Sequence, residues 1–248
     1  MYFCGPQKGF IVANLIIDIG NTALKAAWAD GMTLGKTFRY QGERMLDFIL
    51  SLTGKTRPEK IMLSSARTFS PQAVLRLKDE CDVLMIADEV LFEKYGLPSY
   101  LTSDRAASIV ISRYLFKGRK CSIFDFGTSL SVDFLDEDGN YKGGNISPGC
   151  RTRFKAMNRY SRSLPLMSAP ESIQEIGTDI ESSLSSGVVS GMMFEIMGYV
   201  SRYPENINVF TGGDAIYFAK RMKNSIFVVC NLVLMGLALI AVEYDKKD

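Results

Sequence analysis

Two short segments in different halves of the 248-residue chain share one pattern: an apolar run, an aspartate, and a glycine turn rich in hydroxyl groups. The first places Asp18 before the turn at residues 19–22, and the second places Asp125 before the turn at 126–129. A glycine lets the backbone approach phosphate oxygens, neighbouring amides and hydroxyls donate hydrogen bonds, and a carboxylate at a strand end holds a cation. The repeated pattern favours two related α/β halves that hold a nucleoside triphosphate.

A third turn strengthens this interpretation. One Asp-Gly turn after a strand is ordinary turn chemistry, but two copies followed by a strand and the run Thr211-Gly212-Gly213-Asp214 are a specific combination. Gly212 and Gly213 could pack flat against an adenine or a ribose, although two glycines after a strand often form only a turn. The chain has neither G-x-x-x-x-G-K-[ST] nor G-x-G-x-x-G, so the commonest phosphate loops are excluded.

Composition excludes several other classes of protein. The chain has no histidine, which rules out a Ser-His-Asp triad, a Cys-His pair and zinc sites with imidazole ligands. Its five cysteines are widely spaced and form no C-x-x-C pair, which favours free thiols in a reducing cytoplasm. A net charge of +2 without a basic stripe gives no reason to expect a nucleic-acid partner.

The apolar stretch at 226–242 raises the question of a membrane span, which needs about 20 apolar residues. Asn231 divides the stretch into a β-branched and aromatic run at 226–230 and a run of helix formers at 232–242. A strand, an Asn cap and a helix are therefore predicted, and no membrane span. Residues 1–14 lack the apolar core and cleavage site of a signal peptide and are interpreted as an N-terminal extension.

The remaining hydrophobic patterns predict alternating strands and helices. No Pro/Gly/Ser linker separates the halves, so the domain boundary is topological: an extension at 1–14, a first domain at 15–103 and a second at 104–248. Strands are expected at 15–18, 23–29, after the turn at 30–31, and at 60–65, 82–86, 122–125, 131–135, 141–146 and 207–210. Helices are expected at 42–52, 71–80, 104–116, 151–160 and 180–203.

Five motifs resemble, in order, those of the type III pantothenate kinase family, which belongs to the superfamily of actin, sugar kinases and heat-shock ATPases. The resemblance implies two duplicated actin-like ATPase (ribonuclease H-like) domains with mixed central sheets and an interdomain nucleotide cleft. It also implies ATP-dependent phosphorylation of pantothenate to 4'-phosphopantothenate, the first step of coenzyme A biosynthesis. The matching segments are 18–25 (D-x-G-N-T and a basic residue), Tyr95 with 102–105 (G-x-D-R), 125–128 (the second phosphate loop), 141–149 (Y-x-G-G-x-I-x-P-G) and 211–215 (T-G-G-D-A).

The resemblance assigns the nucleotide side of the site. It implies Mg²⁺ binding by Asp18 and a monovalent cation, K⁺ or NH₄⁺, at Asp125. A solvated strand lysine is the alternative interpretation of Lys25. The implied contacts to ATP come from Asp18, Gly20, Asn21, Thr22, Lys25, Gly127, Thr128, Gly212 and Gly213.

The acceptor side is assigned in the same way. Asp104 matches the aspartate that accepts the proton of the substrate hydroxyl, and Arg105 could orient either the substrate or that carboxylate. An N-cap aspartate at the start of a helix is the alternative for Asp104, and both could hold together. The implied pantothenate-binding residues are Tyr95, Thr102, Ser103, Asp104, Arg105 and Ile180.

Two positions depart from the family pattern. Thr102 stands where the motif has glycine, and Ile180 stands where a threonine hydroxyl is expected to touch pantothenate. A lost hydrogen bond to a buried polar ligand costs about 1–3 kcal/mol, enough for a tenfold or larger loss of affinity. Either Thr178 substitutes after a shift of register, or pantothenate binding is weakened or altered.

The resemblance further implies a homodimer with pantothenate near the subunit interface. Apolar residues at 188–200 then serve dimer packing, although helical spacing alone favours the core. A basic cluster at 151–162 is either solvated surface or faces an anionic ligand. Two alternatives to an active pantothenate kinase stay open: a nucleotide-binding regulatory or accessory homologue with weak or no kinase activity, and a kinase of another small hydroxylated substrate.

Overall fold

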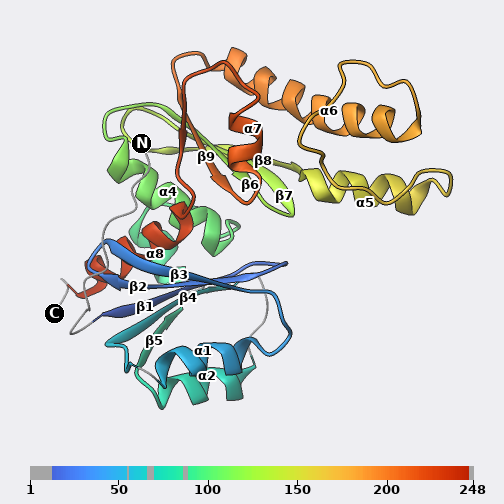
Figure 1. Ribbon diagram of the computed structural model, residues 1–248. Helices are drawn as coiled ribbons and strands as arrows, with labels where there is room; N and C mark the ends of the chain where they lie inside the picture. Colours follow the sequence, from blue (N-terminus) through green and yellow to red (C-terminus); the bar gives the residue numbers. More distant parts are fainter. Residues whose placement is uncertain (1–12, 55, 66–69, 86–88, 246–248) are drawn as a thin grey trace. The chain divides into compact units, whose positions relative to one another are not determined.

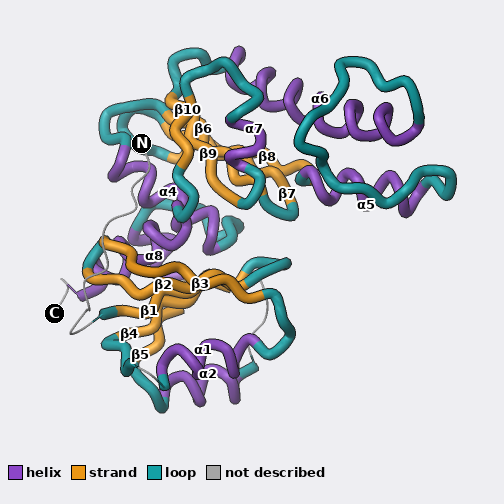
Figure 2. Tube along the Cα trace, viewed as in Figure 1, coloured by secondary structure: helices purple, strands orange, loops and turns teal. Residues whose placement is uncertain are grey.

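The computed structural model describes residues 13–54, 56–65, 70–85 and 89–245, so most of the predicted N-terminal extension lies outside the described residues. The chain forms two compact units, Met1–Leu115 together with Asn231–Asp248, and Phe116–Cys230. Each unit contains one five-stranded sheet with helices packed on it (Figures 1 and 2). The second unit is thus an insertion in the sequence of the first.

The first sheet has the strand order β3-β2-β1-β4-β5. Strands β1 to β3 form an antiparallel meander, whereas β4 and β5 run parallel to β1. Every residue of β1 is buried, as expected for a strand with helices on both faces. The strands are β1 (Asn14–Ile19), β2 (Leu24–Asp30), β3 (Thr33–Tyr40), β4 (Lys60–Ser65) and β5 (Asp82–Met85).

Two layers of helices cover this sheet. One face packs against α1 and α2, whose buried Ile49 and Leu77 join Leu15 and Ile17 in one core cluster. On the other face α8 contacts β1 to β4 and packs along α4, where Gly236 lies directly on the backbone of Ala107. The helices of this unit are α1 (Met45–Thr53), α2 (Pro71–Lys78), α3 (Glu89–Lys94), α4 (Ser103–Leu115) and α8 (Leu232–Asp245).

The second sheet repeats the topology of the first. Its order is β10-β9-β6-β7-β8, with β6, β7 and β8 as the antiparallel meander and β9 and β10 parallel to β6. Strand β6 therefore corresponds to β1, and β9 corresponds to β4. The strands are β6 (Cys121–Phe126), β7 (Ser129–Leu135), β8 (Tyr141–Pro148), β9 (Ile207–Gly212) and β10 (Ile226–Val228).

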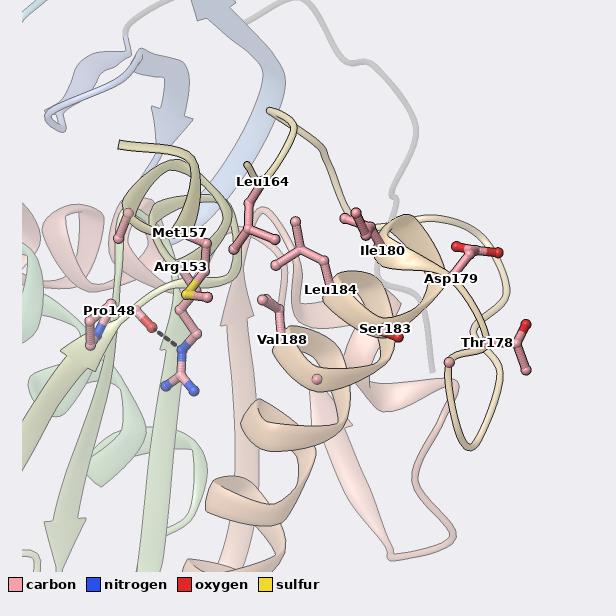
Figure 3. A pocket seen from close by; sticks show the side chains of 13 residues that line it. Pro148, Arg153, Met157, Leu164, Thr178, Asp179, Ile180, Ser183, Leu184 and Val188 are labelled. Carbon is pink, nitrogen blue, oxygen red and sulfur yellow. Dashed lines mark hydrogen bonds between the residues drawn. The ribbon is translucent and has the colours of Figure 1, made fainter. Parts of the chain in front are cut away.

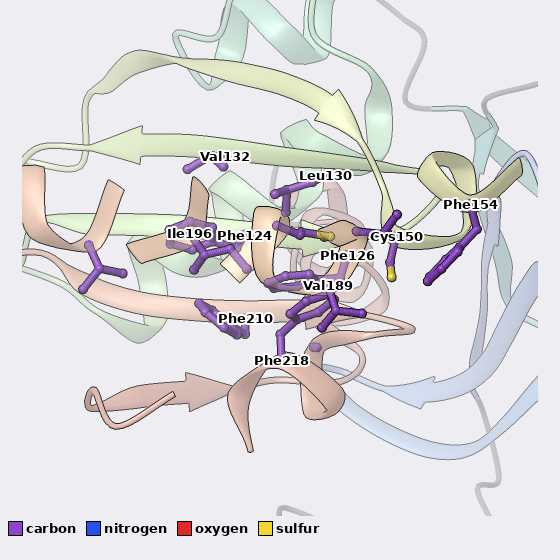
Figure 4. Packing of buried hydrophobic residues seen from close by; sticks show 14 of the residues in the cluster. Phe124, Phe126, Leu130, Val132, Cys150, Phe154, Val189, Ile196, Phe210 and Phe218 are labelled. Carbon is purple, nitrogen blue, oxygen red and sulfur yellow. The ribbon is translucent and has the colours of Figure 1, made fainter. Parts of the chain in front are cut away.

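Aromatic rings dominate the core of the second unit (Figure 4). Phe126 packs 4.8 Å from Phe210 and 5.3 Å from Phe218, measured between ring centroids. Burial of each such side chain contributes about 1.5–3 kcal/mol to folding. The rings fill the space between the sheet and the helices α5 (Cys150–Tyr160), α6 (Ile180–Arg202) and α7 (Ala215–Ala219).

The predicted class, duplicated α/β domains with mixed central sheets, is confirmed. The compact units divide the chain differently from the predicted 103/104 boundary, because α4 and α8 pack on each other and on the first sheet. The stretch at 226–242 is strand β10 followed by α8, and no helix among the described residues is long and apolar enough to cross a membrane. The short helices α3 and α7 are additions to the predicted elements.

Candidate functional site

In the first unit three polar side chains lie in a row across the centre of the sheet. Asp18 on β1 is directly opposite Lys25 on β2 and Ser64 on β4. Leu15 and Ile17 belong to the core on the α1 and α2 side. Because successive side chains of a strand alternate between faces, Asp18 points to the opposite face, which α4 and α8 cover.

The buried hydroxyl of Ser64 joins this row to helix α4. Ser64 is 1% exposed, and its Oγ donates to Oδ1 of Asp18 at 3.3 Å. The same Oγ lies 2.8 Å from Oγ of Ser103, the first residue of α4. The carboxylate of the first predicted phosphate loop and the start of the predicted acceptor motif therefore share one hydrogen-bond chain.

Asp104 lies in the first turn of α4, one residue beyond this chain. Its Oδ1 accepts a hydrogen bond from the backbone N–H of Arg105 at 2.9 Å. The helix begins at Ser103, and the carbonyl of Thr102 accepts the N–H of Ala106 at 3.0 Å, so the interpretation of Asp104 as N-cap of a helix starting at Arg105 is wrong. Arg105 is buried, whereas Thr102 is exposed.

The turn after β1 is open to solvent. Gly20 donates its N–H to the carbonyl of Ala23 at 3.0 Å, which closes the turn, and Asn21 and Thr22 are exposed within it. Among the described residues no group of three or more His, Cys, Asp or Glu could hold a metal ion. Mg²⁺ in nucleotide sites is bound through one or two carboxylates together with phosphate oxygens and water. The single carboxylate of Asp18 beside this turn fits that kind of site.

The second unit contains a corresponding row. Asp125 on β6 is opposite Ser131 on β7 and Thr211 on β9, as Asp18 is opposite Lys25 and Ser64. Thr211 is 1% exposed, so a buried hydroxyl occupies the same place on the parallel strand in both units. The two rows differ on the hairpin strand, where a lysine in the first unit is replaced by a serine in the second.

Three separate motifs meet around Asp125. The N–H of Gly149, the N-cap of α5, donates to the carbonyl of Thr128 at 3.0 Å, and the hydroxyl of Thr152 donates to the same carbonyl at 2.5 Å. Gly212 pairs with Phe126 across the sheet. The second predicted phosphate loop is therefore held between the motifs at 141–149 and 211–215.

Two glycines are required by this close approach. Gly212 has φ +93°, and a Cβ there would overlap Oδ1 of Asp125 and the backbone of Phe126. A Cβ on Gly149 would overlap the carbonyl oxygen of Gly127. Neither position accommodates a side chain without displacing backbone next to Asp125.

Tyr95, predicted to contact the acceptor, is anchored to the C-terminal helix. Its hydroxyl donates to Oε2 of Glu243 on α8 at 2.7 Å, and its carbonyl accepts from Arg113 of α4 at 2.6 Å. Burial raises the pKa of the phenol, and the hydrogen bond to the carboxylate raises it further. The phenol therefore stays protonated at physiological pH, and its proton is directed at Glu243.

Ile180 belongs to the second unit and lines a cavity of about 940 Å³ between α5 and α6. In Figure 3 the side chains of Met157, Leu164, Leu184 and Val188 converge on it. Ile180 is 57% exposed. Thr178 also lines the cavity, but its side chain points away from these apolar groups (Figure 3).

The basic cluster at 151–162, on α5 and just after it, divides into two groups. Arg153 is half-buried, donates to the carbonyl of Pro148 at 2.8 Å and forms an ion pair with Glu195 of α6. The remaining members are exposed, namely Arg151, Lys155, Arg159 and Arg162. The structure thus uses Arg153 to join α5 to α6.

Helix α6 serves both the core and the surface. Its buried face, with Val188, Met192 and Val200, belongs to the core cluster of the second unit, which confirms the packing inferred from helical spacing. Phe194 is 66% exposed on the same helix. The helix begins at Ile180 because Asp179 accepts the N–H of Ser182 in a capping box, and these hydrogen bonds lower the pKa of Asp179.

Sequence reasoning missed two residues at these sites. Ser64 falls in a predicted strand, but the register that sets it beside Asp18 joins strands 46 residues apart. Glu243 lies on a helix 148 residues from Tyr95. No short motif marks either contact, and only the pairing of β1 with β4 and the packing of α8 reveal them.

Comparison with known sequences gives one consistent result. The model of the type III pantothenate kinase family matches residues 14–202. A type III pantothenate kinase of Phocaeicola vulgatus is 36% identical, in an alignment that covers 94% of this chain and 99% of that protein. A type III pantothenate kinase of Flavobacterium johnsoniae is 32% identical, in an alignment that covers 90% of this chain and 95% of that protein.

Solved structures show the same fold at lower identity. A putative Baf family transcriptional activator from Campylobacter jejuni is similar with a TM-score of 0.66 at 21% identity, covering 94% of this chain and 99% of that one. The activator of 2-hydroxyisocaproyl-CoA dehydratase from Clostridium difficile, with bound ADPNP, has a TM-score of 0.57 at 15% identity, covering 95% and 96%. MreB 5 of Spiroplasma citri, bound to AMPPNP, has a TM-score of 0.52 at 11% identity, covering 96% and 98%.

Proposed function

Because this chain belongs to the type III pantothenate kinase family, we propose that it transfers the γ-phosphoryl group of ATP to the hydroxyl of pantothenate, the first step of coenzyme A biosynthesis. The observation that carries the proposal furthest is the hydrogen-bond chain from Asp18 through Ser64 to Ser103, because it joins a phosphate-loop carboxylate to the helix that bears Asp104. Phosphoryl transfer depends mainly on positioning and charge stabilisation, which such a connection serves.

The first unit supplies the phosphate and acceptor groups. The open turn after β1 offers the N–H and hydroxyl donors of Gly20, Asn21 and Thr22 to phosphate oxygens, with Lys25 beside them in the sheet. Asp18 holds Mg²⁺, which neutralises charge on the phosphates when bound. Asp104 accepts the proton of the pantothenate hydroxyl, and its place in the first turn of α4 leaves it half-buried and within reach of solvent.

The second unit supplies the remaining nucleotide contacts. Gly127 and Thr128 are exposed in a turn that Gly149 and Thr152 hold by hydrogen bonds, which suits a rigid phosphate contact. Gly213 is exposed beside Gly212, where a flat surface can receive adenosine. The carboxylate of Asp125 takes the monovalent cation, K⁺ or NH₄⁺.

The remaining acceptor contacts come from Tyr95, Thr102, Ser103 and Arg105, all of the first unit. Ile180, on the second unit, is also assigned to the acceptor, and we propose that the protein is a homodimer with pantothenate near the subunit interface. The exposed apolar side chains of Tyr160 and Phe194, 85% and 66% accessible, support such an interface on α5 and α6. The free thiols of the described cysteines are consistent with a cytoplasmic enzyme.

A second candidate is a kinase of this family that phosphorylates another small hydroxylated acceptor. Ile180 favours it, because this side chain brings no hydroxyl to a cavity lined mainly by apolar groups. Exposed Thr102 favours it as well, since it adds a side chain at the start of the acceptor helix.

The test is ADP release by the purified protein with ATP and Mg²⁺, with and without pantothenate, in Na⁺ and in K⁺. We expect pantothenate-dependent turnover that K⁺ stimulates. Asp104→Asn should lower kcat about 100- to 10,000-fold while the affinity for an ATP analogue stays within twofold, because a general base contributes to chemistry and not to nucleotide binding. Asp30→Asn, at the exposed end of strand β2 in the same unit, is the matched control and should leave kcat unchanged.

The outcomes separate the candidates. Turnover with other hydroxylated acceptors but not with pantothenate would support the second candidate. ATP binding without turnover on any acceptor would contradict both and indicate an accessory homologue. A near-normal kcat for Asp104→Asn would show that another group accepts the proton.

A further inference from the structure

The hydrogen-bond chain in the first unit has a defined direction. An ionised carboxylate only accepts hydrogen bonds, so the single proton of Ser64 points to Asp18, at 3.3 Å between oxygens. Ser64 then has only lone pairs left for Ser103, whose Oγ lies 2.8 Å away. The hydroxyl of Ser103 must therefore donate to Ser64, and the order of donation is Ser103 to Ser64 to Asp18.

This direction depends on the charge of Asp18. A cation on that carboxylate shares its lone pairs and makes it a weaker acceptor for Ser64. The bond to Asp18 is long for an O–H donor, whereas the contact between the two serines has the usual length. When the carboxylate binds a cation, the hydroxyl of Ser64 donates its hydrogen bond to Ser103 instead. The hydroxyl of Ser103 can then donate its own hydrogen bond to a ligand.

We propose that Ser64 and Ser103 form a hydroxyl relay that couples cation and nucleotide binding at Asp18 to acceptor binding at the first turn of α4. When Asp18 holds no cation, the hydroxyl of Ser103 donates its hydrogen bond to Ser64. When Asp18 holds a cation, the hydroxyl of Ser103 donates to an oxygen of the acceptor. Ser64 is a positioning residue in this scheme, since it acts through its two neighbours. The inference rests on the proposed function.

The surroundings of Ser64 favour a relay over a passive buried hydroxyl. Ser64 is 1% exposed and lies in the paired centre of the sheet, so its Oγ cannot turn to water. Ser103 is half-buried at the start of a helix, with one side available to a ligand. By contrast, Ser112 of the same helix is fully buried, and its Oγ has no hydrogen-bond partner among the described residues.

The relay predicts positive and reciprocal coupling between the two ligands. One added hydrogen bond to the acceptor corresponds to about a two- to tenfold gain in affinity. Pantothenate should therefore bind two- to tenfold more tightly when a non-hydrolysable ATP analogue and Mg²⁺ are present. The analogue should bind more tightly by the same factor when pantothenate is saturating.

Calorimetric titration of the full-length protein measures this factor without turnover. The ratio of pantothenate affinities with and without the ATP analogue and Mg²⁺ should fall to about one in Ser64→Ala and in Ser103→Ala. Ser64→Thr, which keeps the hydroxyl, should restore part of this ratio. Ser112→Ala is the matched control, because it removes a buried serine hydroxyl from α4 without touching the relay, and its factor should equal that of the wild type. Thermal unfolding of each variant shows whether it folds, and half-buried Ser103 gives a second test if Ser64→Ala does not.

The results distinguish the relay from the proposed function. Pantothenate binding with a factor of one in the wild type, or an unchanged factor in Ser103→Ala, would overturn the relay and leave the kinase proposal standing. Failure of the wild type to bind pantothenate with or without the analogue would overturn both. A factor lost equally in Ser112→Ala would assign the effect to general packing of α4 and would also overturn the relay.

Discussion

A single added methyl group tests the geometry around Asp125. Gly212→Ala places a Cβ on a residue with φ +93°, where L-residues are strained by about 1–3 kcal/mol. The same Cβ overlaps Oδ1 of Asp125 and both backbone polar atoms of Phe126. The carboxylate can rotate, but Phe126 is held in β6 between β7 and β9, so the overlap adds about 1–3 kcal/mol more.

The next residue provides the matched control. A Cβ on Gly213 would have the carbonyl oxygen of Phe126 as its nearest neighbour at 3.9 Å, an ordinary van der Waals contact. Gly213→Ala should therefore change the free energy of unfolding by less than about 0.5 kcal/mol. Gly212→Ala should lower it by about 2–6 kcal/mol, which corresponds to a fall in Tm of at least about 4 °C.

The assay is urea and thermal unfolding of both variants, followed by titration with an ATP analogue. Because Gly213 is exposed in the predicted adenosine turn, its methyl group should weaken analogue binding while the fold stays intact. Equal stability losses in the two variants, or a stable Gly212→Ala, would refute the account of this turn. Normal analogue affinity in Gly213→Ala would refute the adenosine assignment alone.

Three further outcomes are expected. Gly236→Ala should lower the free energy of unfolding by at least about 1–3 kcal/mol, because its Cβ overlaps the backbone of Ala107; a neutral result in urea unfolding would contradict the contact. Gly198→Ala, in exposed helix interior with open space around the added carbon, should instead raise it by about 0.5–1 kcal/mol, and a lower urea midpoint would count against this. Burial raises the pKa of Cys150 from 9.0 to about 11, so folding disfavours its thiolate. The free energy of unfolding should therefore fall as pH rises from about 9 to about 11, and Cys150→Ala should flatten that part of the plot of stability against pH. Thiol labelling at neutral pH should modify exposed Cys230 before buried Cys150.

Local patterns were sufficient for most elements of this fold. Apolar runs ending in Asp-Gly turns identified β1 and β6. Helix α2 was predicted to start at residue 71, and it begins at Pro71, where Ser70 caps it. Helix α6 begins at Ile180 as predicted, because the Asp179 cap is a local signal. The short helices α3 and α7 carry too few residues for a periodic signal.

The pairing of distant segments could not be predicted in this way. Which strand lies beside β1 depends on a register across the sheet, and this register alone sets Ser64 next to Asp18. Helix α8 is apolar on nearly every side, so its sequence does not indicate which sheet it covers. The candidate residues were therefore identified one by one, but their mutual contacts were not.

The placement of α8 bears on how the chain folds during synthesis. Helix α4 packs against α8, but more than a hundred residues, including the whole second unit, are made between them. The second unit is contiguous in sequence and can complete its own core as soon as residue 230 has left the ribosome. The first unit must wait with the Ala107 face of α4 uncovered until the last helix arrives. Removal of residues 232–248 should therefore leave a folded second unit attached to an unstable first one, a state that limited proteolysis would reveal.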